Sequence, residues 1–269
     1  MKIALALGGG AGLGWSHIGV LRALDDAGIE ITGLAGTSIG GVAAIAYAAG
    51  RLDTLEELAH SVSNLRSVVR YLSPTWKPGS VLSGKAIGKL IDQHLGDLTF
   101  EDLRIPTCVV AADLIGGEAV MIDHGPVGEA IHATIALPGI FHPIVRDNMV
   151  LSDGGAVMPV PVAAARERGG GAPVVAINLQ GDYTNRRRAV GLREESPRLT
   201  TISVLRGATG LMLSKLARLS LDADPPDLEL PLPVGHIDTS NFTRAEELVE
   251  IGREAVAAAL PRIEALAAK

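Results

Sequence analysis

Cysteine and long apolar runs are both scarce in this sequence. Because Cys108 is the single cysteine, no intramolecular disulfide can form, and we expect a reducing, cytoplasmic compartment. No apolar run approaches the roughly 18 residues that a membrane-spanning helix requires. The first apolar run, Ile3–Leu7, is too short for the core of a signal peptide and ends in glycines, so it predicts a buried strand.

The sequence also has no excess of positive charge and few aromatic side chains. The formal net charge of −6 argues against a nucleic-acid-binding protein. Aromatic residues make up 3% of a chain that contains 32 glycines, which favours close packing of backbone on backbone. No linker, internal repeat or low-complexity tract divides the 269 residues.

The pattern Gly36-Thr37-Ser38-Ile39-Gly40 is the point around which the chain is organised. An apolar run precedes it, and small and aliphatic residues at helical spacing follow it as far as Gly50. This predicts a strand, a tight turn and a helix, with Ser38 at the apex and Gly36 and Gly40 removing Cβ atoms that would clash. Backbone N–H groups at the helix N-terminus would then favour negative charge developing at Ser38. An ordinary strand-to-helix turn is the alternative.

A glycine-rich segment, Gly8–Gly14, follows the first apolar run. It does not fit the dinucleotide-binding pattern G-x-G-x-x-G in any register, and no acidic residue ends the second strand about 20 residues on. A second interpretation is an anion cradle, in which the N–H groups of Gly9, Gly10 and Ala11 point at a developing oxyanion. A plain tight turn is the third. His17, in the following helix, is more typical of a structural hydrogen-bonding residue than of a catalyst.

Asp153 ends a predicted apolar strand, where a carboxylate is costly unless it is paired or used. Gly154 and Gly155 follow and leave room for close approach, although an Asp-Gly-Gly turn is common. Because the carboxyl ends of strands in a parallel or mixed sheet share one edge, the cradle, Ser38 and Asp153 are expected to meet there. His236 is the one histidine after Asp153, and its Pro/Gly-flanked position makes a Ser-His-Asp triad a weaker interpretation.

Periodicity and turn residues predict the remaining elements. The expected strands are 107–112, 118–122, 149–152, 173–179 and 228–232, and the expected helices are 15–27, 53–70, 83–95, 126–136, 199–221 and 243–267. Residues 53–56 resemble a capping box, 71–80 form either a flap or a surface connection, and Arg186-Arg187-Arg188 indicates a solvated loop. The helix over 199–221 is expected to pack on the sheet, with a membrane surface or a protein partner as alternatives.

In this order, the glycine cradle, G-x-S-x-G and D-G-G closely resemble the patatin-like phospholipase family. The resemblance includes Leu7–Leu24, Leu137–Phe141, Asp153–Gly155 and the closing residues 241–248, and it looks like that of bacterial, single-domain members. It therefore covers essentially the whole chain. It implies one domain over 1–269 with a three-layer α/β/α fold and a mixed, mainly parallel central sheet.

The resemblance also implies a function. Ser38 and Asp153 would form a catalytic dyad that hydrolyses lipid esters through a covalent acyl-enzyme, without calcium, metal or other cofactor. Gly9, Gly10 and Ala11 would form the oxyanion hole. The implied partner is a lipid or acyl-ester substrate, with peripheral membrane contact and no nucleic acid.

Two residues depart from the family pattern. The family usually carries Arg or Lys where this chain has Leu13, and glycine where it has Ala11. The lost cation supports the alternative of a weakly active or non-catalytic regulatory protein with the same fold. Nucleotide binding by the glycine loop is a third hypothesis.

Overall fold

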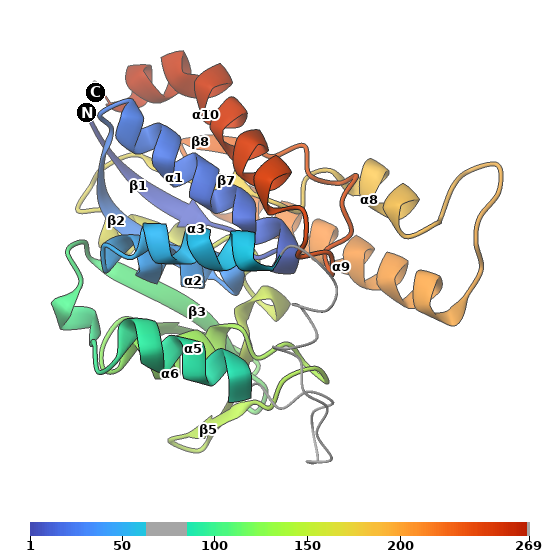
Figure 1. Ribbon diagram of the computed structural model, residues 1–269, viewed down its shortest axis with the longest axis horizontal. Coiled ribbons are helices and arrows are strands. Elements are labelled where there is room, and N and C mark those ends of the chain that lie inside the picture. Colours follow the sequence, from blue (N-terminus) through green and yellow to red (C-terminus); the bar gives the residue numbers. More distant parts are fainter. Residues whose placement is uncertain (63–84, 268–269) are drawn as a thin grey trace.

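The computed structural model describes residues 1–62 and 85–267. Within these residues, eight strands form one sheet with the order β5-β6-β3-β2-β1-β7-β8, and β4 pairs with β3 (Figure 1). The strands are β1 (Lys2–Leu7), β2 (Glu30–Thr37), β3 (Thr107–Asp113), β4 (Ala119–Ile122), β5 (Ile144–Arg146), β6 (Met149–Asp153), β7 (Val174–Asn178) and β8 (Leu228–Pro231). The α-helices are α1 (Ser16–Asp26), α2 (Ile39–Ala48), α3 (Leu52–Ser61), α5 (Lys85–Leu95), α6 (Val127–Thr134), α7 (Val162–Arg168), α8 (Tyr183–Ala189), α9 (Thr201–Ala223) and α10 (Ala245–Ala267).

The sheet is parallel at its centre and antiparallel on one side. β1 pairs in parallel with β2 and β7, β2 with β3, and β7 with β8. β3 pairs antiparallel with β4 and β6, and β5 with β6. This arrangement, with helices on both faces, confirms the predicted three-layer fold with a mixed, mainly parallel sheet.

The alternation of side chains along β1 separates the two faces of the sheet. Ile3, Leu5 and Leu7 point into a large aliphatic core shared with α1, α2, α3 and α10. Ala4 and Ala6 point the other way, into a core of small side chains that includes residues of α7. Because β1 is buried on both faces, it reads in the sequence as a continuous apolar run, which explains why that run predicts it correctly.

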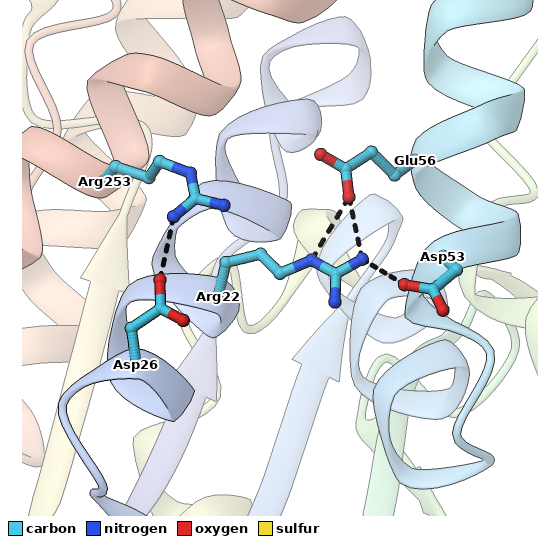
Figure 2. A network of polar contacts seen from close by, with 5 residues as sticks. All are labelled: Arg22, Asp26, Asp53, Glu56 and Arg253. Carbon is cyan, nitrogen blue, oxygen red and sulfur yellow. Dashed lines mark hydrogen bonds and ion pairs between the residues drawn. The ribbon is translucent and has the colours of Figure 1, made fainter.

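Helices α1 and α10 pack closely through glycines. A Cβ on Gly19 would lie 1.8 Å from the Val249 carbonyl oxygen, and one on Gly252 would lie 2.1 Å from that of Ser16. An ion pair extends this contact (Figure 2): Arg253 of α10 binds Asp26 of α1 at 3.0 Å. The two helices are therefore fixed against each other by backbone contact and by surface charge.

The expected capping box at residues 53–56 is wrong. Helix α3 begins at Leu52, and its N-cap residue, Arg51, makes no side-chain capping bond. Asp53 and Glu56 instead bind Arg22 of α1, with Glu56 Oε2 2.8 Å from an Arg22 Nη atom (Figure 2). The remainder of the helix expected to reach Arg70, the segment 71–80 and the expected helix start at Ser83 lie outside the described residues.

Turn residues predict several element ends correctly. Gly28, Gly50 and Gly96 end helices with φ values of 66°, 66° and 55°, which glycine adopts without steric cost. Asp147 and Asn148, with φ of 49° and 64°, form the hairpin turn between β5 and β6.

The expectation that the long helix packs on the sheet is wrong for most of its length. Figure 1 shows α8 and α9, in orange, extending away from the sheet. The residues that α9 buries are mostly small: Ser203, Gly207, Gly210, Ala217 and Leu221. Leu199 just before the helix and six side chains on it are large, apolar and exposed: Ile202, Val204, Leu205, Leu211, Met212 and Leu219. No helix within residues 1–62 and 85–267 is both long enough and apolar enough to span a membrane.

Candidate active site

Ser38 lies at a strained turn between β2 and α2. Its φ of 56° and ψ of −126° are unusual for a residue with a side chain, and such conformations cost about 1–3 kcal/mol. A Cβ on Gly36 would lie 2.3 Å from the Gly40 carbonyl oxygen, and one on Gly40 would lie 2.2 Å from that of Leu7. Both glycines are therefore required for β1, β2 and α2 to converge on Ser38.

Asp153 is hydrogen-bonded to Ser38 in a buried site. The Ser38 hydroxyl donates to Asp153 Oδ2 at 2.5 Å, and Asp153 is 3% exposed. The other carboxylate oxygen, Oδ1, accepts the Gly155 N–H at 2.8 Å. Both oxygens are thus held, and one of them faces the Ser38 hydroxyl.

Burial raises the pKa of Asp153 to about 6, and the hydrogen bonds from Ser38 and Gly155 oppose that shift. A carboxyl group with this pKa is mostly ionised at neutral pH, yet it accepts a proton more readily than a solvated aspartate. Its environment therefore suits it to act as a general base.

The route by which Asp153 reaches Ser38 differs from the expected one. β6 is antiparallel to β3, so it enters the sheet from beyond the carboxyl end of β3 rather than ending there alongside the parallel strands. Asp153 instead pairs with Ala111 of β3, next to Val110, which pairs with Thr37 of β2. A Cβ on Gly154 would lie 2.3 Å from the Val110 carbonyl oxygen, so this glycine lets the chain pass directly over β3.

Thr134, at the end of α6, supports the elbow and was not singled out from the sequence. Its hydroxyl accepts the Ser38 N–H at 2.8 Å and donates to the Val110 carbonyl at 2.6 Å. Two residues further on, the Ala136 carbonyl accepts the Asp153 N–H at 2.9 Å. The sequence feature that could have indicated this role is the single hydroxyl side chain within the otherwise apolar run 133–137.

The glycine loop is held on both sides. The Gly9 N–H donates to the Pro159 carbonyl at 2.9 Å, and the Gly12 N–H donates to the Thr239 carbonyl at 2.8 Å. Between them, the N–H groups of Gly10 and Ala11 meet no acceptor within the described residues. This corrects the predicted donor set in one respect: the Gly9 N–H is committed to Pro159, which leaves the N–H groups of Gly10 and Ala11 as candidate donors.

The two departures from the family pattern have clear structural settings. Leu13 is completely buried and belongs to the main aliphatic core, so apolar packing holds this part of the loop. Ala11 has a φ of 49°, a left-handed conformation that costs a residue with a Cβ about 1–2 kcal/mol. Its N–H is retained, but at the expense of backbone strain.

Neither candidate histidine lies against Ser38. His17 is buried and its Nε2 is 2.8 Å from the Gly8 carbonyl oxygen. Burial lowers the His17 pKa to about 4, so the ring is neutral at pH 7 and Nε2–H donates to Gly8. His236 is exposed and contacts Glu247 of α10 at 2.8 Å.

Gln180 contacts the same loop from behind, and Arg186 contacts Gln180 in turn. Gln180 Nε2 donates to the Gly9 carbonyl at 2.7 Å, and the Arg186 guanidinium donates to Gln180 Oε1 and to the Leu179 carbonyl. The expectation of a solvated loop is wrong for Arg186, which lies on α8 and is 4% exposed. A run of three arginines gives no indication of which one is buried.

An apolar cavity of about 230 Å³ opens beside Ser38. It follows α2, since Ser38, Ile39, Val42 and Ala46 all line it and Arg51 lines it beyond the end of that helix. The other lining residues come mainly from α3, α5 and α6, with Trp15 and Phe242 beside the glycine loop: Ala11, Trp15, Thr54, Leu55, Leu58, Val62, Leu90, Ile91, His94, Leu95, Ile131, Ile135, Leu137, Phe141 and Phe242. Within the described part of the chain, no group of three or more His, Cys, Asp or Glu side chains could hold a metal ion.

Comparisons with known proteins place the chain in a family. The model of the patatin-like phospholipase family matches residues 5–166. An uncharacterized NTE family protein of Mycobacterium bovis is 40% identical over 162 residues, which are 60% of this chain and 45% of that protein. Patatin-like phospholipase domain-containing protein 6 of Mus musculus is 33% identical over 184 residues, 66% of this chain and 13% of that protein. The chain thus spans less than half the length of these relatives.

A solved structure shares the fold. The crystal structure of VipD from Legionella pneumophila aligns with a TM-score of 0.50 and 14% identity, covering 96% of this chain and 66% of that one. At this identity, the likeness concerns the fold alone.

Proposed function

Because the chain belongs to the patatin-like phospholipase family, we propose that it is a serine hydrolase of lipid carboxylic esters, with Ser38 as nucleophile and Asp153 as base. The observation that carries this proposal is the 2.5 Å hydrogen bond from the Ser38 hydroxyl to Asp153 Oδ2, in a buried site. A nucleophile needs such a base in contact, since a serine hydroxyl is otherwise unreactive.

The first half of the reaction forms an acyl-enzyme. Ser38 Oγ attacks the ester carbonyl carbon while its proton passes to Asp153 Oδ2. The N–H groups of Gly10 and Ala11 stabilise the negative charge that develops on the carbonyl oxygen. When the tetrahedral intermediate collapses, the bond to the alcohol breaks, and Asp153 returns the proton to the departing alkoxide.

The second half releases the acid. Asp153 takes a proton from a water molecule, whose oxygen attacks the acyl carbon on Ser38. Collapse of this second intermediate breaks the bond to Oγ, which recovers the proton from Asp153. Every group used is a side chain or a backbone N–H, and we therefore propose that hydrolysis does not depend on calcium.

The cavity supports an acyl chain as the substrate group beside Ser38. Its lining is almost entirely apolar, so it provides burial for hydrocarbon and few hydrogen-bonding partners for a sugar or a nucleotide. It follows α2 past Ala46, and that helix is about 15 Å long. We propose that the acyl chain of the ester lies along α2.

Covalent labelling tests the assignment of the nucleophile. A fluorophosphonate probe is expected to modify the wild-type protein on Ser38, as located by peptide mass spectrometry, and to leave a folded Ser38→Ala variant unmodified. Labelling of that variant at the wild-type rate would overturn the assignment.

The absence of a cation at Leu13 favours a second candidate, a weakly active or non-catalytic regulatory protein of the same fold. If the protein is non-catalytic, neither probe labelling nor ester hydrolysis would exceed the level of Ser38→Ala. Hydrolysis that depends on Ser38 would exclude the non-catalytic form.

We also propose that the exposed side of α9 and its preceding residue contact a lipid surface. Here "the α9 surface" means Leu199, Ile202, Val204, Leu205, Leu211, Met212 and Leu219, all exposed. Residues 183–223, from the start of α8 to the end of α9, carry eight basic and three acidic side chains, although the whole chain has a net charge of −6. Exposed aliphatic side chains beside an excess of basic ones suit an anionic membrane surface.

Vesicle sedimentation tests this contact. The wild-type protein is expected to bind phosphatidylcholine vesicles that contain phosphatidylglycerol, and Leu205→Glu and Met212→Glu should abolish that binding. Ile115→Glu, at an exposed site in the turn between β3 and β4, is the matched control. Unchanged binding by the α9 variants would contradict the proposal, and a dimer that those variants dissociate would assign the surface to a second copy of the chain.

A further inference from the structure

Arg186 places a charged side chain at a buried site on α8, where packing alone does not require a charge. Arg186 forms no ion pair with a carboxylate within the described residues, although Asp182 and Asp238 lie close enough for their charges to stabilise it. Gly210 of α9 covers it, since a Cβ there would lie 3.3 Å from Arg186 Cδ. Burying a cation is costly, and an apolar side chain would fill such a site at lower cost.

The guanidinium fixes the orientation of its neighbour. Arginine can only donate hydrogen bonds, so the Gln180 atom that faces it must be the carbonyl oxygen, Oε1. The amide nitrogen Nε2 is therefore turned toward the Gly9 carbonyl, to which it donates at 2.7 Å. The Gln180 N–H is bound as well, to Asn178 Oδ1 at 2.8 Å.

The Gly9 carbonyl belongs to the same peptide group as the Gly10 N–H. In a planar trans peptide these two groups point in opposite directions. Holding the Gly9 carbonyl on the Gln180 side therefore turns the Gly10 N–H to the other side of the loop. Ser38 lies against this loop, because a Cβ on Gly9 would be 3.4 Å from Ser38 Cβ.

We propose that Gln180 and Arg186 are positioning residues that set the direction of the Gly10 N–H for the oxyanion. This inference rests on the proposed hydrolase function. Neither side chain touches the substrate: Arg186 orients Gln180, and Gln180 holds the peptide group between Gly9 and Gly10. The bond from the Gly9 N–H to the Pro159 carbonyl holds the preceding peptide, so the loop cannot compensate freely when Gln180 is lost.

Gln180→Glu tests the proposal with almost no change in shape. Its carboxylate still accepts from Arg186, but it offers no N–H to the Gly9 carbonyl and places two acceptors face to face. We expect kcat on a short p-nitrophenyl ester to fall about 100-fold, the lower end of the effect of one lost oxyanion donor, with little change in KM. The inhibition constant of a trifluoromethyl ketone, which forms a tetrahedral oxyanion on serine, should rise by a similar factor.

Variants on α8 separate the role of Arg186 from that of its neighbour Arg187. Arg186→Met leaves Gln180 unoriented and should lower kcat, whereas Arg186→Lys keeps a donor for Oε1 and should recover part of the loss. Arg187→Met is the matched control, because Arg187 binds Glu194 and the Leu192 carbonyl instead. If Gln180→Glu does not fold, the comparison of Arg186→Met with Arg186→Lys carries the same test.

The outcomes distinguish this inference from the function on which it rests. A lower melting temperature with unchanged kcat and unchanged inhibition would show a purely structural role and would overturn the inference. If the wild-type protein hydrolyses no ester, the proposed function fails, and the crystal structure of Gln180→Glu decides the positioning role by itself. A turned peptide between Gly9 and Gly10 would support that role, and an unchanged peptide would refute it.

Discussion

Asp153 accepts a hydrogen bond from the Ser38 hydroxyl, and it does so at the end of β6, which runs antiparallel to β3. The two residues are 115 positions apart in the chain, and the 2.5 Å hydrogen bond between them passes over the edge of β3. Gly154 makes the crossing sterically feasible, and Thr134 and Ala136 hold the two backbones from the end of α6. The relative position of the dyad is thus set by α6 and β3 together.

The raised pKa of Asp153 predicts the pH dependence of the reaction. Only the ionised carboxylate can accept the Ser38 proton, and the pKa is about 6. We expect kcat/KM to rise about tenfold per pH unit below that value and to level off above it. Initial rates on a soluble ester across this range measure the profile, and a rate that does not change through pH 6 would contradict the role of Asp153.

Asp153→Asn should separate activity from stability. We expect kcat to fall by at least about 100-fold, because the base is lost. The folded-state pKa lies above the ordinary value of 3.8, so ionising Asp153 in the folded state costs free energy. This cost is absent at low pH and grows as the pH rises toward about 6 and beyond. At pH 7 the neutral amide should therefore raise the free energy of unfolding by about 1–3 kcal/mol.

His236→Ala provides the control for that prediction. His236 contacts Glu247 at an exposed site, so its removal should leave kcat close to wild type. Kinetics and urea unfolding of both variants decide the matter. If His236→Ala is the inactive variant, a histidine is the base and the dyad is wrong.

Ala46→Phe should shorten the acyl chain that the enzyme accepts. Ala46 lines the cavity eight residues beyond Ser38, about 12 Å along α2. A phenyl group there should lower kcat/KM for long-chain p-nitrophenyl esters and leave acetate and butyrate esters unaffected. Ala257→Phe, on the exposed side of α10, is the control. An equal loss for all chain lengths would mean that the chain lies elsewhere.

Ala11→Gly should stabilise the protein by about 1 kcal/mol. Ala11 has a φ of 49°, where a Cβ is strained and glycine is not. The opposite sign is expected for Ala258→Gly, at an exposed position in α10, because glycine lowers helix stability by about 1 kcal/mol. Urea unfolding of both variants measures the difference. Destabilisation by Ala11→Gly would show that the loop strain is relieved in some other way.

Local chemistry explains which elements could be predicted from the sequence. β1 follows from a continuous apolar run, and the elbow follows from glycines two residues before and after Ser38. The capping box at Asp53 and the solvated loop at Arg186 failed because tertiary partners decided the outcome: Arg22 of α1 in one case, Gln180 and α9 in the other. Local patterns of residue type carry no information about such tertiary partners.

The site shows the same limit. Ser38 and Asp153 could be singled out because a strained glycine elbow and a charge at the end of an apolar strand are unusual. The engagement of the Gly9 N–H with Pro159 could not be foreseen, because every glycine in the loop has the same donor. Which of these N–H groups stays without an acceptor depends on carbonyl groups in the segments before α7 and before α10.

The central claim is that Ser38 carries the acyl group during turnover, and trapping the intermediate tests it most directly. The protein is mixed with a long-chain p-nitrophenyl ester, quenched in acid before the steady state, digested and analysed by mass spectrometry. We predict that the mass of one acyl group is found on Ser38 and that the adduct is absent from Ser38→Ala. Acylation of another residue, or an equal burst of p-nitrophenol from Ser38→Ala, would contradict the account.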